Sequence, residues 1–551
     1  MAVRRRQARI TVGLVAAMAL FGIGCNRDKG GGRARRVDAA VAEPVKAPPP
    51  PTQALPETAR ETPPPAARGG VLRVHLEAEP PHLNPLLDGH QVIQRVVSGL
   101  VYETLLECGS DGYRPGLAER WDESSDGLRL VLHLRSVRFH DGHPLGPADV
   151  QASLEPLLRA GTRQPALREL LGDVEAVEVL PDRVVRLRLH RPSRLALRAL
   201  CEVPILPAEG LRGTAAQAAQ LGKQPNGTGP FRVAAWERGK RIRLVRAGPP
   251  GQGPPYLDEI SFEIDGDGAR ALARTRRGDL DVLPRVLDLH YPDQVGSGAL
   301  RETLSLYRLT PDRYSFLVVN HRHQPLSDVR VRRALALSWN RARLAEEVHR
   351  GLARPIAAPF GNLPPLPFDR AAAQRLLDEA GLSDSNGDGV RERAGAPVRL
   401  TLLLPAGSKA AAAEGRAFAL DLRRAGLLLD PVTVDPSTLL SRLKQGEFDL
   451  APMLWEGRPD DDPRMLFGPQ GELAFTGYRS DALAPLLDEL RLADGPRARA
   501  PLLQRIGETL AAEQPVIFLY RHDVVALVSR RVHGLTGSGD RLDLRAVWVD
   551  P

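Results

Sequence analysis

A period of two in the hydrophobic positions marks the first well-defined element of the chain. From Leu128 to Arg135 four leucines alternate with mostly polar residues, and this alternation predicts a strand with one buried face. Asp126-Gly127 before the strand is a hairpin signal, and Asp141-Gly142 after it is a turn signal. This stretch is therefore expected to form a half-buried strand pair bounded by tight turns.

The hydrophobic pattern predicts further strands and helices along the chain. Two strands are expected between Asp173 and His190, a hairpin with its tip at 238–240, and a strand from Tyr314 to Asn320. Asp328 suits the N-cap of a helix, and small or apolar residues form one stripe on it: Val331, Leu335, Ser338, Ala342 and Ala345. From residue 399 to 454 strands and helices alternate, which indicates an α/β body with helices on both faces of a sheet.

The first 25 residues have the pattern of an export signal. Arg4, Arg5, Arg6 and Arg9 precede an apolar run from residue 10 to 23, which is too short to span a bilayer comfortably. Small residues before Cys25 resemble a bacterial lipobox, although Gly22 occupies the place where a lipobox has leucine. We expect Cys25 to be lipid-modified. The alternative is an ordinary secretory signal with an incidental cysteine.

Residues 26–69 have the composition of a disordered tether rich in proline and alanine. Residues 1–70 hold twelve Lys/Arg and five Asp/Glu, a net charge of +7, whereas the whole chain carries +8. The basic balance therefore belongs to the leader and tether, and it does not indicate nucleic-acid binding, which needs basic residues on a folded face.

The body that follows is too long for one hydrophobic core and predicts two or three lobes. Only Cys108 and Cys201 remain after Cys25. In an exported protein they either pair or stay as two buried thiols, and the sequence favours neither. No Cys/His spacing typical of a metal site occurs.

Three runs of residues carry a resemblance to a known family. They are Leu117-Ala118-Glu119-Arg120-Trp121 with 137–145, Gly227-Thr228-Gly229-Pro230-Phe231, and 325–335. The chain resembles the bacterial extracellular solute-binding proteins of family 5, the oligopeptide, dipeptide and nickel receptors of ABC importers. The resemblance implies an α/β, two-lobed periplasmic-binding-protein (Venus flytrap) fold with an extra subdomain in lobe I. It further implies lobe I at 70–285 with a subdomain at about 105–225, lobe II at 286–510, and a C-terminal return to lobe I at 511–551.

The resemblance also suggests ligand-binding positions. In peptide receptors of the family a tryptophan forms a cleft wall, and an aspartate three residues later holds the ligand's ammonium. Here Trp455 is followed by Arg458, and Asp460 and Asp461 come later. Either the loop has shifted, or the ammonium site is lost and an anion is favoured; a solvated acidic loop is the plain alternative.

Other ligand-binding candidates are weaker. Lys409 is the nearest basic residue for a ligand carboxylate, although an exposed loop lysine explains it more simply. Asn84 and the residues up to His90 are expected at the cleft rim by resemblance. Asp384 to Gly389 resembles half of a calcium loop, but the twelfth position is Gly395, so a solvated turn is favoured and no metal is expected.

No nucleophile and base stand out, and a Gly-x-Ser-x-Gly elbow is missing from the sequence. We therefore expect no enzyme and no cofactor. The leading hypothesis is a periplasmic or otherwise extracytoplasmic, membrane-anchored lipoprotein, monomeric, that captures a peptide or similar small polar solute and delivers it to an ABC permease. The alternative is a sensory or scaffolding lipoprotein that keeps the receptor fold without a transport role.

Overall fold

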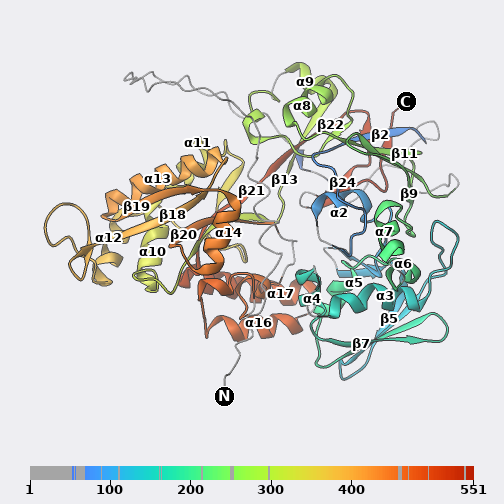
Figure 1. Ribbon diagram of the computed structural model, residues 1–551, viewed down its shortest axis with the longest axis horizontal. Helices are drawn as coiled ribbons and strands as arrows, with labels where there is room; N and C mark the ends of the chain where they lie inside the picture. Colours follow the sequence, from blue (N-terminus) through green and yellow to red (C-terminus); the bar gives the residue numbers. More distant parts are fainter. Residues whose placement is uncertain are drawn as a thin grey trace.

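The computed structural model describes most of the chain after residue 68, together with a short piece of the preceding segment. The described residues are 53–54, 56, 69–87, 90–109, 112–159, 162, 164–212, 215–248, 254–295, 298–456, 462–469, 471–493, 495–538 and 541–550. They form two lobes, each built on its own mixed sheet, and a smaller antiparallel sheet beside the first lobe (Figure 1). None of the helices in these ranges has the length and apolarity that crossing a membrane requires.

Lobe I contains an eight-stranded sheet. Its order is β1 (Gln53–Ala54), β13 (Leu304–Leu309), β22 (Val524–Ser529), β12 (Val282–Leu283), β2 (Val71–Leu76), β11 (Glu259–Ile264), β10 (Arg241–Arg246) and β9 (Phe231–Glu237). On one face α2 (Gln91–Val97) packs its buried Val92, Ile93 and Val96 against strand residues such as Leu72. On the other face α8 (Gly268–Arg276) packs against β12, β13 and β22.

The subdomain of lobe I is a four-stranded antiparallel sheet. Its order is β5 (Ala118–Glu123), β6 (Arg129–Leu134), β8 (Val184–Leu189) and β7 (Val174–Leu180). The predicted alternation is confirmed, because Leu130, Leu132 and Leu134 of β6 are buried in one cluster with residues of α3 (Pro147–Leu158). Nearby elements complete it: β3 (Leu106–Gly109), β4 (Gly112–Pro115), α4 (Pro165–Leu170), α5 (Leu195–Leu200), α6 (Ala208–Arg212) and α7 (Ala215–Lys223).

The motif that begins at Gly227 joins the subdomain to lobe I. A Cβ atom on Gly227 would lie 1.8 Å from the carbonyl oxygen of Val101, so only glycine fits there. The Phe231 N–H then donates to the carbonyl of Leu100 at 2.9 Å. This motif is therefore a close backbone contact and not a phosphate-binding loop.

Lobe II contains a six-stranded sheet with helices on both faces, as predicted (Figure 1). Its order is β15 (Ala353–Pro355), β21 (Val516–His522), β14 (Arg313–Val319), β20 (Leu450–Glu456), β18 (Arg399–Pro405) and β19 (Leu428–Val434). Successive residues of β14 enter opposite cores: Leu317 joins one hydrophobic cluster and Phe316 the other. The period of two along this strand thus places a core on each side of the sheet.

Each core of lobe II is closed by its own set of helices. One set is α10 (Val329–Ser338), α11 (Arg341–Glu347), α12 (Arg370–Glu379) and α13 (Lys409–Ala425), and the other is α14 (Pro436–Gln445), α15 (Arg464–Phe467), α16 (Leu483–Leu492) and α17 (Gly495–Glu513). Asp328 caps α10 as predicted, because its side chain accepts a hydrogen bond from the Arg330 N–H at 2.8 Å.

The chain passes between the two lobes twice, and the two passages are neighbours. β13 belongs to the first sheet and β14 to the second, so one passage lies at 310–312. β21 and β22 make the return at Asp523. These points lie later in the chain than the expected boundaries at 285 and 511. The sequence could not place them, because hydrogen-bonding partners distant in sequence decide which sheet a strand joins. We propose the two passages as the lobe boundaries.

Part of the expected tether is structured. Gln53 and Ala54 add a parallel strand beside Tyr307 and Arg308 at the edge of the lobe I sheet. The Gly537 N–H donates to the Pro56 carbonyl at 3.3 Å. At these residues the structure differs from the expectation of a disordered segment, because an unpaired sheet edge offers backbone partners that composition does not reveal. Residues 1–52, including Cys25, lie outside the described residues.

Cys108 and Cys201 form a disulfide bond, which decides between the two alternatives that the sequence left open. Cys108 lies on β3, and Cys201 follows α5 as its C-cap. The bond closes a loop across 93 positions of sequence and ties the small hairpin to the subdomain helices. It joins two parts of the subdomain that the sequence separates widely.

Removal of this bond is expected to destabilise the protein by up to about 4–5 kcal/mol, since it releases the entropy of a long closed loop in the unfolded chain. Cys108→Ser, Cys201→Ser and the double variant should unfold at nearly the same urea concentration, below that of the wild type. Additive losses from the single variants would contradict a shared bond. Thiol alkylation of the unfolded wild type without reductant should leave both cysteines unmodified.

Candidate functional site

Lobes I and II are joined by a chain of polar side chains where α2 begins and β20 ends. Gln91, the first residue of α2, donates a hydrogen bond from Nε2 to Glu456 Oε2 at 2.6 Å. Glu456, the last residue of β20, also forms an ion pair with Arg313 Nε at 2.8 Å. Arg313 and Glu456 are direct partners in the β14–β20 ladder, so the sheet register itself places the pair. We call the region around these three residues the seam.

Lobe I brings a second ion pair to this region. Arg95 on α2 lies with one terminal nitrogen 2.5 Å from Glu77 Oε1, just after β2. Burial would raise the pKa of Glu77, but the positive charge of Arg95, with His75 and Arg285, holds that pKa below its ordinary value. Glu77 is therefore a carboxylate at neutral pH, and its charge is balanced by Arg95.

Arg285 is the cation at the seam whose charge is not balanced by a partner. It follows β12 and is half-buried. Among the described residues its guanidinium makes no hydrogen bond or ion pair. Its charge acts on Glu77 in lobe I and on His522 in lobe II. Arg285 is thus a partly desolvated cation that both lobes sense.

His522, the last residue of β21, contributes a neutral ring. Burial, together with His349, Arg313 and Arg285, holds its pKa well below the ordinary 6.5. Its Nε2 atom is hydrogen-bonded to Ser315 Oγ at 2.8 Å. Although it is surrounded by protein atoms, its side chain keeps some exposure. His522 therefore offers a polar but uncharged group on the lobe II side.

Among the groups described above, one positive charge is in excess. Arg95 balances Glu77, Arg313 balances Glu456, His522 is neutral, and Arg285 remains. A guanidinium has five N–H donors that match a carboxylate in a bidentate arrangement. Ser315 Oγ lies beside the neutral His522 ring, and the unbalanced guanidinium of Arg285 suits the binding of an anion.

Comparison with known proteins agrees with this architecture. The sequence profile described as "Bacterial extracellular solute-binding proteins, family 5 Middle" matches residues 112–472. The chain belongs to this family. The resemblance found from sequence motifs is thereby confirmed, and so is the two-lobed α/β fold.

Three similar proteins illustrate the match. Protein XP55 from Streptomyces lividans is 28% identical over 484 residues, covering 84% of this chain and 85% of XP55. The dipeptide-binding protein of Escherichia coli (strain K12) is 25% identical over 500 residues, covering 83% of this chain and 90% of that protein. The structure of the oligopeptide-binding protein AppA from Bacillus subtilis, in complex with a nonapeptide, superposes with a TM-score of 0.70 at 22% identity and covers 88% of this chain and 100% of AppA.

Trp455 lies beside the seam. Trp455 directly precedes Glu456 in β20 and is half-buried against the lobe II core with Tyr314 as its ladder partner. Arg458, Asp460 and Asp461 lie outside the described residues, so their roles stay predictions. Trp455 thus lies near the end of a strand, and its role as a wall of the ligand cleft stays a prediction.

Lys409 and Asn84 do not join the seam in this structure. Lys409 is the exposed first residue of α13, without a polar partner among the described residues. It lies at the same sheet edge as Trp455, because β18 and β20 run parallel. Asn84 is 1% exposed, and its Oδ1 accepts a hydrogen bond from the Leu86 N–H at 3.0 Å, which holds a turn. Their ligand contacts stay predictions.

His90 lies nearer to the seam. It is the exposed N-cap of α2, where its Nδ1 accepts a hydrogen bond from the Val92 N–H at 3.3 Å. The next residue, Gln91, makes the contact to lobe II. Sequence analysis did not find Gln91, Glu456 or Arg285. Arg285 belongs to none of the family motifs in the sequence. Its lack of a hydrogen-bond or ion-pair partner among the described residues can be seen only in the folded structure.

A shallow hollow along α16 of lobe II is not part of this site. Its volume is about 600 Å³, and residues 481–492 of α16 and the preceding turn line it. Lobe I contributes none of its lining residues, and the hollow opens broadly to solvent. Arg491 on α16 contacts Asp173 and Arg194 of lobe I, but all lining residues of the hollow belong to lobe II, so we do not assign the ligand to it.

Gln91→Ala is expected to weaken the contact between the lobes, because a hydrogen bond to a charged carboxylate contributes about 1.5–3 kcal/mol. Small-angle scattering of the ligand-free protein should show a larger radius of gyration for Gln91→Ala than for wild type. Gln94→Ala, a change on the same helix without a contact to lobe II, is the matched control. An unchanged radius in Gln91→Ala would show that this bond does not hold the lobes together.

Proposed function

We propose that the protein is the extracytoplasmic solute receptor of an ABC importer and that it binds a peptide or similar small polar solute with a carboxylate group at the seam. The observation that carries this proposal is Arg285, a half-buried guanidinium without a polar partner among the described residues. A partly desolvated cation without a partner is costly. A ligand carboxylate would remove that cost.

The comparisons support the ligand class. Relatives include a dipeptide-binding protein, and AppA was solved with a nonapeptide. Every peptide with a free C-terminus ends in a carboxylate, the group that a guanidinium binds best. The family membership supports a receptor, and the seam supports the choice of a ligand with an anionic group.

Both lobes supply polar groups to this proposed site. Arg285 belongs to lobe I, whereas His522, Glu456 and Arg313 belong to lobe II. A ligand that contacts both sets would favour the closed arrangement over an open one, because only the closed arrangement offers both sets at once. Binding would thereby be coupled to the relative position of the lobes, which a permease can sense.

The partner of the ligand's amino end depends on which residue after Trp455 takes the place of the family aspartate. Glu77 and Glu456 already have cationic partners, Arg95 and Arg313. If Arg458 takes the place of the family aspartate, an anionic or N-blocked solute fits better than a zwitterionic dipeptide. If Asp461 takes that place, ordinary peptides bind.

The location and the delivery step are part of the same proposal. The charged start, the apolar run and the lipobox-like residues before Cys25 support a lipid anchor outside the cytoplasmic membrane. Residues 26–52 and 57–68 would then connect the anchor to the receptor body. Family membership supports a permease as the partner to which the solute is passed.

A ligand screen tests the binding site. Peptides of two to five residues, free or C-terminally amidated and free or N-acetylated, are compared by thermal shift, since a ligand raises the melting temperature by mass action. We expect stabilisation by peptides with a free carboxylate and its loss on amidation. Arg285→Gln should weaken binding by about tenfold or more, the equivalent of one charge-assisted hydrogen bond.

The control for this screen is Arg232→Gln, which removes an exposed arginine of β9 in the same lobe. It should bind as the wild type does. Equal binding by Arg285→Gln and wild type would contradict the assigned role of Arg285. Free and N-acetylated peptides are also compared in Arg458→Ala and Asp461→Ala. This comparison shows whether Arg458 or Asp461 takes the place of the family aspartate.

Mass spectrometry of the mature N-terminus tests the anchor. We expect the mature chain to begin at Cys25 with attached acyl chains, and Cys25→Ala to move from the membrane fraction to the soluble fraction. A mature protein that begins elsewhere and carries no lipid would contradict this part of the proposal and leave the solute site unaffected.

A further inference from the structure

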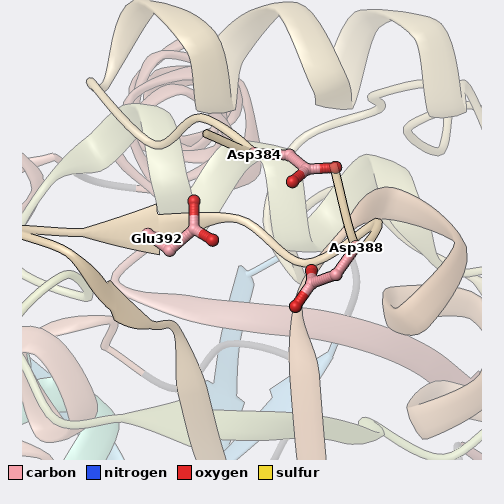
Figure 2. A group of neighbouring side chains, drawn as sticks. All are labelled: Asp384, Asp388 and Glu392. Carbon is pink, nitrogen blue, oxygen red and sulfur yellow. The ribbon is translucent and has the colours of Figure 1, made fainter. Parts of the chain in front are cut away.

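Three acidic side chains of lobe II meet in the loop between α12 and β16 (Glu392–Arg393), far in sequence from the seam residues. Asp384, Asp388 and Glu392 each bring one carboxylate oxygen within 4.8 Å of the other two. Figure 2 shows Glu392 at the strand, with its carboxylate directed toward the turn that carries the two aspartates. Like charges this close repel one another unless a cation lies between them.

Glu392 distinguishes this cluster from a solvated acidic turn. Its relative exposure is only 7%, and its Oε2 accepts hydrogen bonds from the Ser385 N–H at 2.8 Å and from Ser385 Oγ at 3.1 Å. Its other oxygen, Oε1, is buried and has no hydrogen-bond partner among the described residues. A buried carboxylate oxygen without a partner is costly, and a bound cation would supply the missing interaction.

The neighbouring arginines do not neutralise the cluster. Arg391 points its guanidinium away, to Asp378 at 2.5 Å and to the carbonyl oxygens of Leu382 and Ala425. Arg393 is exposed and forms no ion pair with any described residue. The three carboxylates therefore lack a protein counter-charge in the described part of the chain.

The spacing of the acidic residues agrees with an oxygen-ligand cation loop. Counted from Asp384 as the first position, Asp388 is the fifth and Glu392 the ninth, and Asn386 is the third. Calcium loops of the EF-hand type draw ligands from these positions and need glycine at the sixth for a sharp turn. Gly389 is the sixth residue, and its φ is +79°. The loop pattern places the closing acid at the twelfth position, so the sequence alone does not indicate Glu392.

We propose that Asp384, Asp388 and Glu392 form a calcium site. All three ligands are hard oxygens, and an irregular set of carboxylates suits Ca²⁺ better than Mg²⁺, which demands near-octahedral geometry and gives up its waters reluctantly. The twelfth position is Gly395 and supplies no carboxylate. We therefore place the dissociation constant on the order of 10⁻⁴ to 10⁻³ M, the range of extracellular calcium modules.

The site would have a structural effect on lobe II. Glu392 donates its N–H to the Ser383 carbonyl at 2.8 Å, and β16 pairs with β17 (Ala396–Pro397). The loop thus lies between the end of α12 and the strands that lead to β18. Calcium bound there would fix this connection, independently of any ligand at the seam.

Calcium titration of the purified full-length protein tests the site. After treatment with a chelator and its removal, Ca²⁺ is added to wild type, Glu392→Gln and Asp388→Asn, and binding is followed by calorimetry and by melting temperature. Wild type should bind saturably and melt at a higher temperature with millimolar Ca²⁺. Both variants should lose at least about tenfold in affinity, since even changes outside the ligand set reach that size.

The control is Asp481→Asn, which removes the same charge from an exposed position of the same lobe and should bind like wild type. With chelator present, Glu392→Gln should be at least as stable as wild type, because it removes repulsion. Wild type without saturable calcium binding, or Glu392→Gln with unchanged affinity, would overturn the proposal. Equal stabilisation by Mg²⁺ would overturn the assignment to calcium.

Discussion

Two neighbouring passages, from β13 to β14 and from β21 to β22, carry the chain between the lobes and set how the two sheets meet. β13 pairs with β22 in lobe I, and their continuations β14 and β21 pair in lobe II. Asp523 lies at the passage and is 3% exposed. It accepts hydrogen bonds from Arg308 at 2.6 Å and from Arg354 at 3.0 Å. A buried carboxylate is stable only with such partners, so this ion-pair network fixes the point where one sheet gives way to the other.

Because the passages are adjacent, the two sheets meet along one line and the seam forms there. Glu456 reaches this line through the β14–β20 register, and Gln91 reaches it from the start of α2. The charges around them balance except for Arg285. The seam is thus a place where small changes in lobe position change polar contacts, which is the property that a solute receptor of two lobes requires.

The disulfide and the loop at Asp384 have a different relation to the seam. Cys108 and Cys201 join parts of the subdomain, and the acidic loop joins α12 to the strands of lobe II. Neither contributes a side chain to the seam. Each lies within one lobe and contributes nothing to the passages between the lobes. Rigid lobes on a narrow double connection are what hinge closure needs.

Local patterns in the sequence were enough to predict several elements and the family. The leucines from Leu128 to Leu134 predicted β6, and Asp328 predicted the start of α10, because period and capping are local properties. The motif at Gly227 was found as a family signature, and the structure explains it by a contact with the Val101 backbone. Sequence also located the strand end at Trp455, but it could not determine what surrounds that residue.

Which side chains meet depends on how the whole chain folds. Gln91 and Glu456 are 365 positions apart, and no local pattern brings them together. Contacts between distant segments likewise decide three other features. They are the pairing of Cys108 with Cys201, the passages at 310–312 and Asp523, and the burial of the Glu392 oxygen. Arg285 is an ordinary arginine in the sequence. Its guanidinium has no hydrogen bond or ion pair among the described residues. That property depends on the folded surroundings, so the sequence does not show it.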